Sequence, residues 1–144
     1  MPYRYRDDIA TADIAFEAWG ATLVELFKAA ADATLNVMVE ELETVRCTET
    51  VPCFLENTAL DLLLFDFLGE LIFHKDAGRL LLRPQELSLT EEDGAWELAA
   101  ELCGEAIDVS RHPLNVDVKA VTLHRFCLEQ QHDGTWRAMV VLDI

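Results

Sequence analysis

The segment from Leu60 to Phe73 constrains the fold of this 144-residue chain most strongly, because its apolar residues cover nearly every side of a helix. Asp61 interrupts them near the start, and Asp66 and Glu70, one helical turn apart, form a narrow polar strip. A helix that is apolar all round must be mostly buried. We therefore predict a buried helix from Thr58 to about Asp76, with Gly78 as its C-cap. The apolar positions are Leu60, Leu62, Leu63, Leu64, Phe65, Phe67, Leu68, Leu71, Ile72 and Phe73.

A strand and another helix are predicted earlier in the chain. Apolar residues at positions 14, 16 and 18 alternate with Asp13, Glu17 and Trp19, which predicts a strand that Gly20 closes. The run from Thr22 to Glu25 is a capping box, in which the two side chains accept hydrogen bonds from free backbone N–H groups. The apolar stripe that follows has helical spacing and consists of Leu23, Leu26, Phe27, Ala30, Thr34, Val37 and Met38.

The remaining patterned segments predict strands. Pro52 favours an edge position for the first of them, and Asp133-Gly134 between two alternating runs is a strong hairpin signal. We predict one α+β domain over residues 1–144, with two helices packed on one mostly antiparallel sheet of about five to seven strands. The predicted strands are residues 44–55, Arg79 to Leu89, Ala95 to Cys103, Val118 to Glu129 and Trp136 to Ile144.

The net charge limits the partners of the chain. It has 11 Lys and Arg against 27 Asp and Glu, which gives −16. Direct, non-specific nucleic-acid binding depends on basic side chains that displace counterions, and we do not expect it here. An acidic membrane surface is disfavoured for the same reason. A cation, a basic protein surface or a neutral ligand is the expected kind of partner.

The cysteines and the N-terminus indicate a soluble, cytoplasmic protein. The four cysteines and four histidines show no zinc-site spacing, so we predict that all four cysteines are small, reduced core residues. The N-terminus lacks the apolar stretch of a secretory signal. No apolar run is long enough for a membrane span, because acidic residues interrupt the longest one.

Two acidic residues stand where exposure to solvent does not fully explain them. Asp13 begins the first predicted strand, and Asp143 continues a face shared with Met139 and Val141. If the two strands are neighbours, Asp13, Asp143 and the terminal carboxylate of Ile144 converge. Such hard oxygens suit a calcium-like or magnesium-like cation. The alternative is that Asp13 caps a turn while Asp143 pairs with a surface cation, and composition alone favours that alternative.

Other candidates carry weaker signals. Lys119, one of three lysines, is able to neutralise clustered carboxylates or contact a phosphate, or it is an exposed residue at a strand edge. The pair Asp66 and Glu70 suits acid–base work, but the solvated strip of a buried helix is the favoured interpretation. His112 and His124 are potential general bases, although no Ser or Cys is spaced as a nucleophile for them. No glycine-rich phosphate loop is present.

Four blocks in order over the chain resemble the archease family. Each is weak alone, and together they are specific. They are Thr11 to Gly20 with Thr22 to Phe27, Leu62 to Ile72, Gly104-Glu105 through Arg111-His112-Pro113 to His124, and Val140 to Ile144.

The resemblance implies an archease-like two-layer fold and an accessory protein rather than an enzyme. Archeases assist the RtcB-type RNA-splicing ligase, which seals tRNA exons or broken RNA with GTP and manganese, and they promote its guanylation and multiple turnover. The family's metal ligands match Asp13, Asp143 and Ile144, with calcium the expected cation and magnesium or manganese as alternatives. The Val-Lys-Ala motif matches Lys119 as a functional cation.

Some positions depart from the family pattern. Ile9 and Ala10 stand where many members carry an acidic residue and a histidine, and Gly69 replaces an Asn or Asp before Glu70. Two competing functions remain. One is an acidic, chaperone-like module that binds basic proteins, in which the carboxylates are structural. The other is a stand-alone metal-dependent hydrolase that uses Asp13 and Asp143, which is disfavoured because no nucleophile or base accompanies them.

Overall fold

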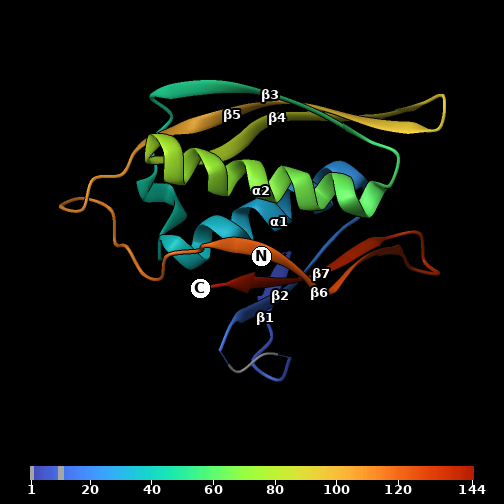
Figure 1. Cartoon of the computed structure of the whole chain (residues 1–144), viewed down its shortest axis with the longest axis horizontal. Coiled ribbons are helices and arrows are strands. Elements are labelled where there is room, and N and C mark those ends of the chain that lie inside the picture. Colours follow the sequence, from blue (N-terminus) through green and yellow to red (C-terminus); the bar gives the residue numbers. More distant parts are fainter. Residues whose placement is uncertain (1, 10–11) are drawn as a thin grey trace.

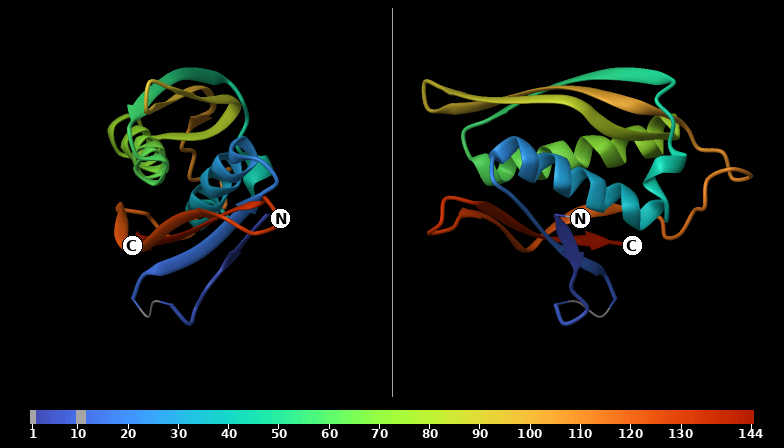
Figure 2. Two further views of the ribbon diagram at one scale, coloured as in Figure 1. Left: turned by 90° about the vertical axis from the view of Figure 1, so that its right-hand side faces the viewer. Right: turned by 180° about the vertical axis from the view of Figure 1, so that it is seen from behind.

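Two antiparallel sheets enclose a layer of two helices in the computed structural model, which describes residues 2–9 and 12–144 (Figures 1 and 2). The first sheet has the order β1-β2-β7-β6, and the second has the order β3-β5-β4. The helices are α1 (Leu23–Met38) and α2 (Leu60–Gly78), and a short 3-10 helix spans Leu42–Thr44. The strands are β1 (Tyr3–Tyr5), β2 (Ile14–Gly20), β3 (Glu49–Asn57), β4 (Leu80–Glu92), β5 (Ala95–Ala106), β6 (Ala120–Gln130) and β7 (Trp136–Asp143).

The α+β class is confirmed, but the prediction of one sheet and two layers is wrong. Helix α2 contacts β3, β4 and β5 on one side and β6 on the other. A helix with apolar residues on nearly every side needs such cover on both sides, which a single sheet does not provide. The two sheets therefore follow from the same all-round apolar pattern that predicted burial of this helix.

Local signals explain how the helices begin and end. The Thr22 hydroxyl accepts the N–H of Glu25 at 3.2 Å, and the Glu25 carboxylate accepts the N–H of Thr22 at 3.3 Å, so the predicted capping box is confirmed. Helix α2 begins at Leu60 without a side-chain cap, two residues after the predicted Thr58. It ends at Gly78, and the C-cap is Arg79, which takes the left-handed conformation (φ 53°) one residue after the predicted C-cap at Gly78.

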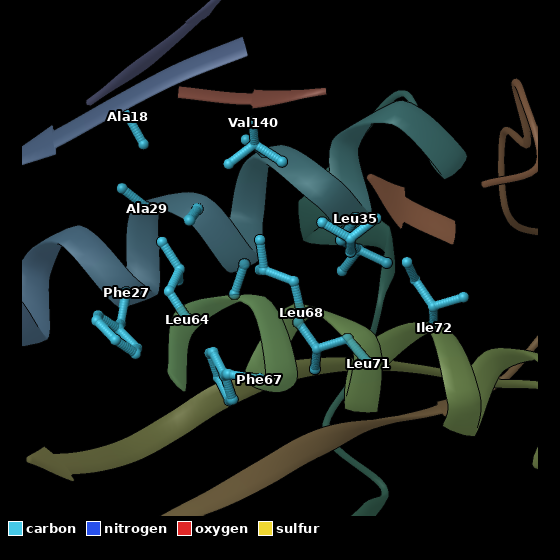
Figure 3. Packing of buried hydrophobic residues seen from close by; sticks show 14 of the residues in the cluster. Ala18, Phe27, Ala29, Leu35, Leu64, Phe67, Leu68, Leu71, Ile72 and Val140 are labelled. Carbon is cyan, nitrogen blue, oxygen red and sulfur yellow. The ribbon is translucent and has the colours of Figure 1, made fainter. Parts of the chain in front are cut away.

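The core lies where the helices meet the sheets (Figure 3). Phe27 of α1 and Phe67 of α2 are fully buried, with ring centroids 6.1 Å apart. Figure 3 shows Ala18 of β2 and Val140 of β7 pointing toward α1. The inner face of the first sheet is thus the face that carries Ala18 and Val140, and the alternate residues of these strands lie on its outer face.

Strand pairing agrees with several predictions and extends others. The β6–β7 pairing confirms the hairpin at Asp133-Gly134, where Gly134 has the positive φ of 90° that favours glycine. Pro52 lies in β3, which is an edge strand as predicted. Strand β3 begins only at Glu49, whereas the predicted segment began at Thr44, where a 3-10 helix ends. Strand β1 was not predicted, since three residues are too few to show alternation.

The prediction of four reduced core cysteines is wrong. Cys47 and Cys103 form a disulfide, with their Cα atoms 5.1 Å apart. Cys53 is buried, whereas Cys127 is exposed. The sequence placed Cys47 within a strand, but it precedes β3 and lies beside β5, which carries Cys103. Among the described residues, no helix has the length and apolar character needed to cross a membrane.

Candidate functional site

Residues from distant parts of the chain meet at one end of the first sheet. Strands β2 and β7 are antiparallel, with Ile14 opposite Leu142. One further step in this register places Asp13 opposite Asp143, and Ile144 follows directly. Both aspartates are half-buried. The predicted neighbour relation between the Asp13 strand and the final strand is therefore present in the fold.

The two aspartates share the outer face of the sheet. Asp143 alternates with Leu142 and Val140, whose side chains face the helices, so its own side chain lies on the opposite face. By the same alternation Asp13 shares a face with Ala15 and Glu17. Ile144 is also half-buried, but it packs against the core cluster. This packing holds Ile144 beside the two aspartates.

Lys119 is brought to the same end of the sheet. Its backbone N–H donates to the carbonyl oxygen of Asp143 at 2.8 Å, one residue before β6 begins. The next residue, Ala120, is the register partner of Asp143. The side chain of Lys119 is exposed. This arrangement puts one basic side chain next to the strand that carries the C-terminal aspartate.

The donors at this end suit a hard cation. Two carboxylates and the carboxyl group of Ile144 supply only oxygen atoms, which calcium and magnesium prefer over nitrogen or sulfur. No three His, Cys, Asp or Glu side chains within residues 2–9 and 12–144 are grouped closely enough to hold a metal ion. A three-ligand site at this place thus needs an oxygen atom of Ile144 in addition to the two aspartates, and the metal site stays a prediction.

The residues just before Asp13 are only partly described. Ala10, one of the two positions that depart from the family pattern, and Thr11, which begins the Thr-Ala-Asp motif, lie outside the described residues. Ile9 is half-buried and donates its N–H to the Arg6 carbonyl at 3.4 Å.

Glu70 and Asp66, which both lie on α2, have partners outside the candidate site. The Glu70 carboxylate lies 3.6 Å from Nε2 of His74, and the Asp66 carboxylate accepts a hydrogen bond from the Asn57 amide at 3.0 Å. Helix α2 lies on the opposite side of the first sheet from the outer face. The structure therefore does not bring Glu70 together with Asp13 and Asp143.

His112 belongs to a separate buried cluster. Its Nδ1 accepts the N–H of Asp108 at 2.9 Å, so Nε2 carries the proton and donates to Glu105 at 3.2 Å. Glu105 also accepts the N–H of Arg46 and pairs with Arg111. The Arg46 N–H, together with His112 and Arg111, lowers the pKa of Glu105 although burial opposes this. Both ring nitrogens of His112 are thus engaged in holding the loop before β6.

One charged group was missed by the sequence interpretation. Glu17 lies on the outer face of β2 with 2% of its surface exposed, and Arg4, Arg6 and Arg137 surround its carboxylate. Burial alone raises the pKa of this group, but the guanidinium groups outweigh burial, so the pKa of Glu17 is lowered. The signal in the sequence is a single carboxylate within an otherwise uncharged strand.

Comparison with known proteins identifies the family. The model of the archease protein family (MTH1598/TM1083) matches residues 3–144. The archease of Thermococcus gammatolerans is 34% identical over 136 residues, which cover 93% of this chain and 94% of that protein.

Two solved structures share the fold. The solution structure of Methanobacterium thermoautotrophicum protein 1598 superimposes with a TM-score of 0.83 at 31% identity and covers 99% of both chains. The crystal structure of a Thermotoga maritima archease, described as a possible chaperone, has a TM-score of 0.61 at 20% identity over 96% of both chains. With a family model that spans nearly all its residues and a relative that is 34% identical over 93% of its length, this chain belongs to the archease family.

Proposed function

We propose that the protein is a cytoplasmic accessory factor that activates an RtcB-type RNA-splicing ligase. It promotes guanylation and multiple turnover of that ligase in tRNA splicing or RNA repair. The observation that carries the proposal is the meeting of Asp13, Asp143, Ile144 and Lys119 at one end of the first sheet. Membership of the archease family supports the role of a helper protein rather than an enzyme.

A divalent cation fits the oxygen donors at this end of the sheet. Asp13, Asp143 and the carboxyl group of Ile144 would hold it, with calcium preferred and magnesium or manganese as alternatives. A bound cation supplies positive charge for the oxygen atoms of a nearby phosphate. Lys119 adds an exposed ammonium group at the same end, and its backbone hydrogen bond to Asp143 holds its main chain beside that strand.

The partner is expected to present a basic surface. With a net charge of −16, the chain is attracted to the positively charged groove of a protein that binds RNA. Exposed charges are screened over about 8 Å at physiological ionic strength. Association with the ligase should therefore weaken as salt is added, mainly through a slower association rate.

The test is a guanylation time course with the purified ligase and GTP. Asp13→Asn and Asp143→Asn each remove one negative charge with little change in volume. Each should weaken calcium binding, measured by titration calorimetry, by about tenfold or more, since one charged ligand is lost. Each should also reduce the stimulation of guanylation. Lys119→Gln should reduce stimulation without abolishing calcium binding.

Glu91→Gln is the matched control, because it removes one carboxylate from an exposed position on β4 of the second sheet. It should leave both readouts unchanged. Stimulation that is equal for the wild type, Asp13→Asn and Asp143→Asn would contradict the proposed role of the acids, even if the ligase still binds.

The second sheet favours one alternative, an acidic module that binds basic proteins. On its outer face Glu56 stands opposite Glu97, and Glu86 stands opposite Glu101. Like charges directly opposite each other are unfavourable, so a basic partner relieves this repulsion. This function predicts that a Glu97→Gln and Glu101→Gln double variant loses partner binding while Asp143→Asn retains it.

A further inference from the structure

The guanidinium groups around Glu17 exceed what neutralising one carboxylate requires. Arg4 comes from β1, Arg6 follows β1, and Arg137 comes from β7 on the other side of β2. One guanidinium group balances the charge of Glu17. Arg6 also pairs with Asp8, through two hydrogen bonds of 2.9 and 2.7 Å. The positive charge of this cluster is therefore concentrated on Arg4 and Arg137.

The surface of the cluster is basic although its centre is acidic. The side chains of Arg4 and Arg137 are 64% and 41% exposed, whereas that of Glu17 is 2% exposed. An approaching molecule meets the two guanidinium groups and does not reach the carboxylate beneath them. This is an unusual feature on a chain with a net charge of −16.

Both arginines keep most of their donors free of protein acceptors. Arg4 donates to Glu17 through Nε, and Arg137 donates to it through one terminal nitrogen. Within the described residues, the two side chains make no other hydrogen bonds. Each guanidinium group has five N–H donors, so four remain on each. Because Arg4 contacts one oxygen of Glu17 and Arg137 the other, their spare donors flank the same point.

An aromatic side chain lies beside the arginines. Trp19 is two residues after Glu17 in β2, on the same face by alternation, and is the register partner of Arg137. It is 40% exposed. Guanidinium groups match the oxygen atoms of a phosphate, and an exposed indole provides a flat surface on which a base stacks.

We propose that Arg4 and Arg137 bind a phosphate group of a nucleotide, and that Trp19 stacks with its base. The nucleotide is either free or the end of an RNA strand, since both present the same chemistry. The overall negative charge repels a longer polyanion, so the site takes one or two phosphates. Glu129, which stands opposite Arg137 on β6, adds a repulsive charge at the rim.

The nucleotide site lies on the same outer face as the candidate metal ligands. Asp13 and Glu17 are four positions apart, which corresponds to about 13 Å along the strand. This inference goes beyond the proposed function and does not depend on a bound cation or on the ligase. Binding measured with EDTA present therefore tests the nucleotide site separately from the metal site.

The experiment is a titration of the isolated protein, in EDTA and low salt, with pyrophosphate, GTP and a five-nucleotide RNA. An Arg4→Gln and Arg137→Gln double variant should bind all three ligands at least about tenfold more weakly, because two charge-assisted contacts are lost. Arg6 still pairs with Glu17 in this variant, and its circular dichroism and Tm show whether the fold is retained. Arg46→Gln, which removes an exposed guanidinium group elsewhere, is the control for a general loss of surface positive charge.

Two further variants separate the contribution of base stacking to nucleotide binding from the contribution of charge. Trp19→Ala should weaken binding of GTP and RNA but not of pyrophosphate, whereas Glu129→Gln should strengthen binding of all three. Tighter binding of GTP than of RNA assigns the site to a free nucleotide, and the reverse assigns it to an RNA end. The proposal is overturned if the wild type binds none of the ligands, or if a folded double variant binds them as well as the wild type.

Discussion

The same substitution at two glycines should change stability in opposite directions. Gly104 lies in β5, the central strand of the second sheet, and pairs with Leu82 of β4 and Glu49 of β3. A Cβ atom at Gly104 would lie 1.7 Å from the carbonyl oxygen of Leu81, whereas ordinary contacts are 3.4–4 Å. The clash is with backbone, so rotating a side chain does not relieve it and the strands must separate.

We expect Gly104→Ala to reduce the free energy of unfolding by about 3 kcal/mol, at the upper end of the cost of overpacking. For a chain of this length, that lowers Tm by about 10 °C. Gly69→Ala is the matched control, because a Cβ atom there meets nothing within 4 Å in the middle of α2. It should raise stability by about 0.5–1 kcal/mol, since alanine favours the helix.

The assay is urea unfolding followed by far-UV circular dichroism and by tryptophan fluorescence. Both variants should keep the m-value of the wild type, which shows that the same surface is exposed on unfolding. A Gly104→Ala protein that loses less than 1 kcal/mol would refute the reasoning, because it would mean that β4 and β5 adjust to the methyl group at little cost. An equal loss at Gly69 would refute it as well.

Other perturbations follow from buried charges and from the disulfide. Because the folded-state pKa of Glu17 is lowered, its stabilising effect is present above the unfolded pKa, about 4.3, and is lost as pH falls through the folded value. Glu17→Gln should therefore be less stable at pH 7 and lose less stability between pH 5 and 3, as measured by urea unfolding. Lys75→Met should cost about 1–3 kcal/mol in thermal unfolding, because the Val118 carbonyl loses its 2.8 Å bond to the buried ammonium. Reduction of the Cys47–Cys103 disulfide, which closes 56 residues, should lower Tm by an amount that corresponds to about 2–4 kcal/mol, with no effect of reductant on Cys103→Ser.

Local signals in the sequence predicted the helices well. The capping box at Thr22 and Glu25 depends on residues three apart, and the apolar stripe of α1 repeats within one helix. Burial of α2 also followed from its own composition. The presence of two sheets did not, because strand pairing is decided by residues far apart in sequence, such as Thr50 with Cys103 in β3 and β5.

The candidate site, like the fold, was predicted only in part from the sequence. The neighbour relation of Asp13 and Asp143 was a hypothesis about register, and the β2–β7 pairing brings the two together. The cluster around Glu17 was not predicted, since its arginines come from residues 4, 6 and 137. A buried ion-pair cluster of this kind has no characteristic spacing in the sequence. The only indication of it is that Glu17 is the one charged residue of its strand.

The position of β7 has a consequence for protein synthesis. This strand is made after all the others, yet it lies in the middle of the first sheet between β2 and β6 (Figure 1). On the ribosome, the helices and the second sheet can form while the edge of β2 that pairs with β7 is still unpaired. A nascent chain that stops before Trp136 therefore exposes an apolar, unpaired strand, the kind of surface that chaperones and proteases recognise.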